Sequence, residues 1–180
     1  VKYDPRTFKF IGGIIRGGSI MVVAKDKVAN LFDKSKPPVV VAADDGFDTA
    51  SNLVLWAAAQ ANWNLRFVVG YPGTGAMTLA ARRGEVDSMV TSNITILIPM
   101  EQRGFVSVVQ VGQLQNGKVL PQPRWPNVKI ITQLMEEQKL TGLAAETFDY
   151  WVKNAQIDKW FALPPKAPAN VVKTYNVAYQ

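Results

Sequence analysis

Two glycines raise the question of what this chain can bind. Gly70 and Gly75, in the stretch VVGYPGTGAM, have the separation found in the phosphate-binding motif G-x-x-x-x-G-K-[ST]. That motif needs a lysine and then a hydroxyl to contact the phosphates and the metal ion, and Ala76 and Met77 occupy those places here. The stretch therefore predicts a strand, a glycine turn and a helix N-terminus that binds an oxygen-bearing ligand. A nucleotide bound without hydrolysis stays an alternative.

Three carboxyl groups follow an apolar run in the stretch VVVAADDGFDTAS, at Asp44, Asp45 and Asp48. In one interpretation Asp48 caps the following helix and the other two lie in solvent. In another, a carboxylate faces the ligand and selects an amine or several hydroxyls, because desolvated like charges repel a dicarboxylate. In a third, these oxygens hold a hard cation, although the spacing is not that of an EF-hand.

The absence of two residue types excludes several kinds of chemistry. Among the 180 residues there is no Cys and no His, which excludes disulfides, thiol nucleophiles, imidazole bases and His-ligated metals within this chain. The possibilities that remain are catalysis by carboxylate or lysine side chains, and binding without catalysis. An enzyme that uses Asp44, Asp45 or Asp87 as acid or base is therefore the second hypothesis. The formal charge of +6 comes from scattered Lys and Arg, which indicates a solvated basic surface rather than a nucleic-acid interface.

These residues lie on an alternation of strands and helices. Short apolar runs predict strands, and apolar residues at helical spacing predict the helices between them. The strands are expected at residues 37–43, 64–70, 85–93 and 105–112, and the helices at 49–63, 74–84 and 94–103. This order predicts an α/β fold with a Rossmann-like, doubly wound, mainly parallel sheet flanked by helices. In such sheets ligands bind beyond the carboxyl ends of the strands, so the loops ADDGFDTAS and GYPGTGAM matter most.

The two ends of the chain have other patterns. Residues 8–27 contain two apolar segments broken by paired glycines, which indicates an extended crossing segment rather than a helix. Residues 116–129 are rich in proline and predict an ordered surface loop. Amphipathic helices are expected at 131–140 and 146–161, and a proline turn leads into a last helix within 164–180.

Five segments, taken in order, resemble one family across nearly the whole chain. They are FKFIGGIIRGGSIMVVAKDK, VVVAADDGFDTASNLV, VVGYPGTGAMTLAARRGEVDSMV, RWPNVKIITQLMEE and WFALPPKAPANVVKTYNVAY. Their order and motifs resemble the solute-binding receptors of tripartite tricarboxylate transporters. These are periplasmic proteins with the two-lobed type II binding-protein fold.

The resemblance implies that the chain is the second lobe of such a receptor, and that the first lobe would precede Val1. It implies a crossover segment at residues 1–22, an α/β ligand-binding lobe at 23–130, and C-terminal helices at 131–180 that return toward the first lobe. The surface that would face the first lobe is then apolar, which favours self-association of the isolated lobe.

The resemblance also implies a binding site made of backbone N–H groups and hydroxyls that hold a carboxylate or carbonyl. Carried over to this sequence, Gly46 and Thr49 belong to the first loop, and Asp87 to the strand that begins G-E-V-D. Asp44, Asp45 and Asp48 depart from the family, which usually has small residues, Ser or Gly, there. The expected ligand-binding residues are Asp45, Gly46, Asp48, Thr49, Tyr71, Gly73, Thr74, Gly75 and Asp87.

The resulting expectation is a periplasmic receptor, not an enzyme, for a small organic acid or a related metabolite. Its partners are the ligand and the subunits of a membrane transporter, and we expect no nucleic acid, no cofactor and no metal ion. For Asp87 a structural role, as a cap or a hydrogen-bond acceptor for a neighbouring loop, stays open beside the ligand-binding role.

Overall fold

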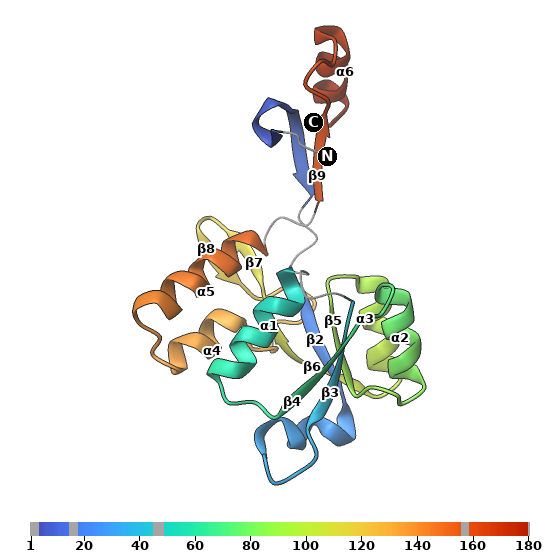
Figure 1. The fold of residues 1–180 in the computed structure, drawn as a ribbon, viewed down its shortest axis with the longest axis vertical. Helices are drawn as coiled ribbons and strands as arrows, with labels where there is room; N and C mark the ends of the chain where they lie inside the picture. The colour runs from blue at the N-terminus through green and yellow to red at the C-terminus, as the bar shows by residue number, and fades with distance from the viewer. Residues whose placement is uncertain (1–3, 15–17, 45–48, 156–158, 180) are drawn as a thin grey trace. The chain divides into compact units, whose positions relative to one another are not determined.

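The computed structural model describes residues 4–14, 18–44, 49–155 and 159–179. The chain divides into two compact units, one of Val1–Arg16 with Ile157–Gln180 and one of Gly17–Gln156 (Figure 1). Within the described ranges, no helix has the length and apolar character needed to cross a membrane. The expected division at residues 22 and 130 stays a prediction about a longer, two-lobed protein.

The larger unit is built on a sheet of five strands in the order β4-β3-β5-β2-β6. The strands are β2 (Ile20–Ala24), β3 (Val39–Ala43), β4 (Leu65–Val69), β5 (Ser88–Thr91) and β6 (Phe105–Gln110). β3 pairs in parallel with β4 and β5, whereas β2 is antiparallel to both β5 and β6. The α/β prediction is confirmed, and the sheet is mixed because β2 runs against the other strands.

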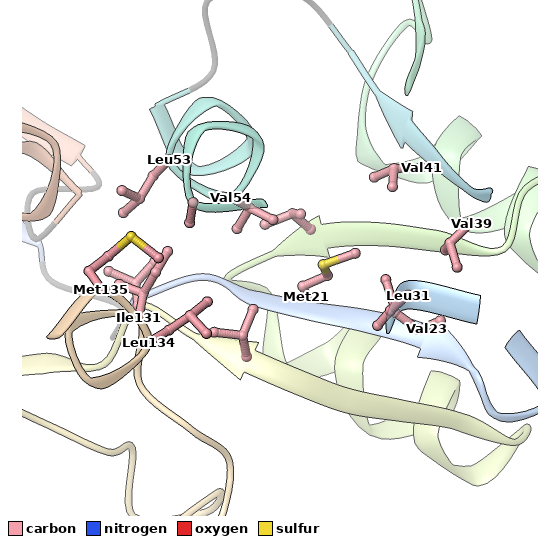
Figure 2. Close-up of a cluster of buried hydrophobic side chains, with 14 of the residues drawn as sticks. Met21, Val23, Leu31, Val39, Val41, Leu53, Val54, Ile131, Leu134 and Met135 are labelled. Atoms are coloured by element: carbon pink, nitrogen blue, oxygen red, sulfur yellow. The ribbon is translucent and has the colours of Figure 1, made fainter. Parts of the chain in front are cut away.

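Helices cover both faces of this sheet, as a doubly wound fold requires. They are α1 (Thr49–Gln60), α2 (Thr74–Arg82), α3 (Ile94–Gln102), α4 (Ile131–Glu137) and α5 (Gly142–Asn154), with a 3-10 helix η2 (Lys25–Phe32). Figure 2 shows one core cluster, in which side chains of β2 and β3 meet Leu53 and Val54 of α1 and Ile131 of α4. The second cluster lies under α2 and α3.

β2 is the strand that separates these two clusters. Met21 and Val23 belong to the first cluster, and Ile20 and Val22 to the second, because successive side chains of a strand point to opposite faces. All four side chains have 0% exposure, which accounts for the continuous apolar run at this place. Of the extended segment expected for residues 8–27, the strands β1 (Lys9–Ile14) and β2 are confirmed, whereas Lys25, Asp26 and Lys27 lie in the 3-10 helix η2.

The segment after β6 is ordered, as predicted, but part of it is buried. It contains a hairpin of β7 (Gln113–Gln115) and β8 (Lys118–Leu120), followed by Trp125, which is only 7% exposed. The indole Nε1 of Trp125 donates to Glu101 Oε1 at 2.6 Å, and Gln110 Nε2 donates to the carbonyl oxygen of Trp125 at 2.7 Å. These bonds hold the proline-rich segment against α3 and β6.

The smaller unit consists of the 3-10 helix η1 (Pro5–Thr7), the antiparallel strands β1 (Lys9–Ile14) and β9 (Lys159–Leu163), and α6 (Ala169–Tyr179). The predicted helix over 146–161 is confirmed as far as Asn154, where α5 ends, and is wrong at Lys159, Trp160 and Phe161, which lie in β9. Tyr179 packs on Gly12, where a Cβ atom would lie 2.2 Å from the tyrosine Cε1. Its hydroxyl donates to the carbonyl oxygen of Gly13 at 2.5 Å.

Candidate functional site

The carboxyl ends of β3 and β4 lie side by side at one edge of the sheet. The parallel register pairs Ala43 with Val69. Beyond the strands, the amide of Gly70 donates to the carbonyl oxygen of Asp44 at 3.0 Å, and the amide of Tyr71 donates to that of Ala43 at 3.3 Å. The chain then enters α1 after β3 and α2 after β4. Both predicted loops therefore start from the same edge.

The N-terminus of α2 offers amide groups without acceptors. Gly73 is the N-cap residue, with φ 133° and no side chain to cap the helix. The amides of Ala76 and Met77 donate to the carbonyl oxygen of Gly73 at 3.0 and 3.2 Å. Among the described residues, the amides of Gly73, Thr74 and Gly75 have no acceptor. Such amides, together with the helix dipole, favour an anion at this position.

Glycine is needed where this loop turns. Gly70 and Gly73 have φ values of 106° and 133°, a region that L side chains rarely adopt. No atom lies within 4 Å of the place where a Cβ would stand at Gly70, Gly73 or Gly75. The backbone around α2 is therefore open to a close approach by a ligand. Tyr71 is half-buried and packs against the cluster under α2 and α3.

A third junction at the same edge was missed by the sequence reasoning. β5 ends at Thr91, and Asn93 is the N-cap of α3. Asn93 Oδ1 accepts bonds from the amide of Thr95 at 3.0 Å and from its hydroxyl at 2.8 Å. Since β5 is parallel to β3, this junction lies at the edge where the other two begin. The run Thr-Ser-Asn between a strand and a helix was the signal that could have revealed it.

Asp87 lies at the opposite edge of the sheet. It directly precedes β5, and its Oδ2 accepts a bond from the amide of Val40 at 2.9 Å. Its own amide donates to the carbonyl oxygen of Val40 at 2.8 Å, and its carbonyl oxygen accepts from the amide of Ala24 at 2.8 Å. Val40 is near the start of β3, so the structure does not bring Asp87 together with the two loops.

The remaining expected residues fall into two groups. Tyr71, Gly73, Thr74 and Gly75 are brought together at the start of α2, after the carboxyl end of β4. Thr49 is the first residue of α1, the helix that follows β3. Asp45, Gly46 and Asp48 lie outside the described residues. The hard-cation interpretation depends on two of them and stays an alternative. The first group is the candidate site.

Comparison with known proteins identifies the fold. No family model matches the chain, and no curated protein matches it. The crystal structure of a TctC solute-binding protein from Polaromonas matches with a TM-score of 0.56 and 13% identity, over 99% of this chain and 56% of that chain. A structure described as a periplasmic transporter matches with a TM-score of 0.51 and 14% identity, over 99% of this chain and 68% of that one.

These matches define the class of fold. The chain has the fold of one lobe of a type II periplasmic binding protein, and it spans 56% of the length of the Polaromonas protein. At this level of identity the likeness concerns the fold, and function has to be argued from the candidate site.

Proposed function

We propose that this chain is the ligand-binding lobe of a periplasmic receptor that captures a small organic acid, or a related metabolite, for a tripartite tricarboxylate transporter. The observation that carries the proposal is the set of amides at Gly73, Thr74 and Gly75, which lack acceptors among the described residues and stand beside the carboxyl end of β3. In α/β sheets this edge is where ligands bind. The fold shared with solute-binding proteins supports the same role.

In this proposal the ligand carboxylate accepts hydrogen bonds from the α2 amides, and the hydroxyl of Thr74 adds a further donor. Hydrogen bonds to a charged group contribute about 1.5–3 kcal/mol each. The helix dipole adds about 0.3–1 kcal/mol. When a first lobe is supplied, its closure over the ligand completes the site. The membrane subunits of the transporter then receive the ligand.

A screen of small carboxylates by native mass spectrometry and thermal unfolding tests the receptor role. We expect at least one carboxylate to bind and to raise the melting temperature, because a ligand that binds only the folded state stabilises it. The recovered ligand should be chemically unchanged, whereas an enzyme would convert it. If no carboxylate shifts the melting temperature at millimolar concentration, the proposal fails.

A proline at the first position of α2 tests the site itself. Thr74→Pro removes both the amide donor and the hydroxyl. The helix tolerates it because proline is accepted at this position and Gly73 already has an extended ψ of 176°. We expect an unchanged melting temperature and at least about tenfold weaker carboxylate binding. Thr74→Ser, which keeps both donors, is the matched control and should bind normally. Equal affinities of the two variants would contradict the proposed site.

A further inference from the structure

Many of the Lys and Arg residues that are scattered along the sequence gather at one edge of the sheet. At this edge, here termed the amino edge, β3, β4, β5 and β6 begin and β2 ends. It comprises residues 24–38, 60–66, 82–87 and 101–105, all of which the structure describes. Figure 1 shows η2 and the starts of β3 and β4 at the lower end of the larger unit.

The amino edge is more basic than the rest of the larger unit. It has eight Lys and Arg against five Asp and Glu, a formal charge of +3. The whole larger unit has thirteen Lys and Arg against twelve Asp and Glu, so its other residues sum to −2. The eight cations are Lys25, Lys27, Lys34, Lys36, Arg66, Arg82, Arg83 and Arg103. The larger unit therefore has one positive end.

The carboxylates of the amino edge engage these cations only loosely. Three exposed ion pairs, each with an N–O distance of 3.8 Å, are Lys27–Asp26, Lys36–Asp33 and Arg83–Glu85. Exposed pairs of this kind contribute little to stability, so their cations can turn to another partner. Lys25, Lys34 and Arg66 have no carboxylate within 4 Å among the described residues.

The loop between η2 and β3 holds its lysines on a fixed backbone. The side-chain amide of Asn64 donates to the carbonyl oxygens of Asn30, Asp33 and Lys36 at 3.2, 3.0 and 3.0 Å. The side chains of Lys34 and Lys36 extend from this loop and are exposed. A loop that is already ordered loses less conformational entropy when it binds a partner.

An exposed aromatic ring lies in the same segment. Phe32, the last residue of η2, is 68% exposed. Its ring meets that of Trp63 edge to face, with 6.0 Å between the centroids, which supports the ring and leaves most of its surface in water. Aromatic rings flanked by lysines are typical of protein surfaces that bind at the headgroup level of a membrane.

From the positive end and the exposed Phe32 we infer that the amino edge binds the surface of a membrane that contains anionic phospholipids. The lipid phosphates attract the Lys and Arg side chains, and the phenyl ring enters the headgroup region. Cations on four separate segments suit a continuous layer of phosphates. This inference goes beyond the proposed function, whose candidate site lies at the other edge of the sheet.

Co-sedimentation with lipid vesicles tests the inference. We would compare vesicles of phosphatidylcholine alone with vesicles in which about one third of the lipid is the anionic phosphatidylglycerol. The salt concentration would be about 0.1 M, where charges more than about 10 Å from the lipid are screened. We expect binding to the anionic vesicles only, and its loss at about 1 M salt.

Two double variants with the same net charge test the amino edge itself. Lys34→Gln with Lys36→Gln should weaken binding to anionic vesicles by about fivefold for each lysine. The control is Lys118→Gln with Lys153→Gln, in β8 and near the end of α5, which Figure 1 shows away from η2. It should change binding by less than about twofold. All four lysines are exposed, so the melting temperatures should equal that of the wild type.

Phe32→Ser tests the contribution of the ring. It leaves the charge unchanged and should weaken binding to anionic vesicles severalfold, because the ring no longer enters the headgroup region. Unchanged binding would overturn the role of Phe32.

Three results would overturn the inference as a whole. The first is an absence of binding to anionic vesicles, which would favour an acidic protein as the partner of this edge. The second is equal binding to neutral and anionic vesicles. The third is an equal effect of the two double variants, because net charge and not the amino edge would then govern binding. None of these results bears on the carboxylate site.

Discussion

The backbone and carboxylate of Asp87 connect the starts of β3 and β5 with the end of β2. Its Oδ2 accepts from the amide of Val40 in β3 at 2.9 Å, and its carbonyl oxygen accepts from the amide of Ala24 in β2 at 2.8 Å, directly before β5 begins. An aspartate here supplies an acceptor that an apolar side chain would lack. With an apolar side chain at position 87, the half-buried amide of Val40 would have no acceptor.

Substitution of Asp87 separates a structural role from a ligand-binding role. We expect Asp87→Ala to lower the free energy of unfolding by about 1–3 kcal/mol, because an amide is left without an acceptor. Asp87→Asn keeps an oxygen acceptor and should cost less. Urea unfolding measures both effects. The affinity for a carboxylate should be the same in the Asn variant as in the wild type, and a large loss of affinity would place Asp87 in the site instead.

At the scale of elements, α2 is defined by glycines with different roles at its two ends. After its last turn, Gly84 has φ 73°. The amide of Glu85 donates to the carbonyl oxygen of Ala80 at 3.0 Å, and that of Gly84 donates to Ala81 at 3.1 Å. This is the Schellman arrangement, in which glycine avoids backbone strain. Gly75, in the first turn, has no positive φ.

Alanine substitutions at these two glycines should have opposite effects on stability. Gly84→Ala forces a side chain into the left-handed region and should lower the free energy of unfolding by about 1 kcal/mol. Gly75→Ala should raise it by about 0.5–1 kcal/mol, because alanine favours the helix and no atom lies within 4 Å of the new Cβ. Thermal unfolding of the two variants tests this, and a stabilising Gly84→Ala would contradict the assigned conformation.

Most elements of the larger unit were predictable because each one buries its own apolar residues. The run before Asp44 gives β3, and the helical spacing around Leu53 gives α1. The direction and central position of β2 were not predictable, since they depend on pairing with β5 and β6, far away in the sequence. β9 was missed because a short apolar run such as KWFAL fits a helix or a strand until its partner is known.

The candidate site was predictable only where local sequence determines the conformation. Gly73, Thr74 and Gly75 predict a helix N-terminus from local sequence alone. Asp87 could not be placed by its motif, because its distance from the loops depends on which end of β5 it occupies. Asn93 carried a local capping signal, but its position beside the loops follows only from the parallel pairing of β3 with β5.

At the scale of the whole molecule, the two units differ in how much they bury. In the larger unit, the side chains of Ile20 to Val23 in β2 have 0% exposure. In the described part of the smaller unit, no apolar side chain is buried, and Phe10 and Trp160 are 56% and 69% exposed. A two-stranded sheet with this little burial is marginally stable alone. The expected self-association through an exposed apolar surface stays a prediction.

Hydrogen exchange should reveal this difference directly. We expect the amides of β1 and β9 to exchange at least about a hundredfold faster than those of β2 and β5, because local opening is easiest where few apolar contacts are lost. Mass spectrometry of peptides from each strand measures the rates. Equal protection in both units at low protein concentration would contradict the expectation. Protection of β1 and β9 that appears only at high concentration would indicate that another copy covers them.

The central claim is that the amides at the start of α2 bind the carboxylate of a ligand. An amide-resolved NMR titration of the chain with benzoate tests it most directly. The amide signals of Gly73, Thr74 and Gly75 should move together with one dissociation constant, while those of Val40 and Asp87 stay in place. Saturable shifts confined to the opposite edge of the sheet, with none at α2, would contradict it.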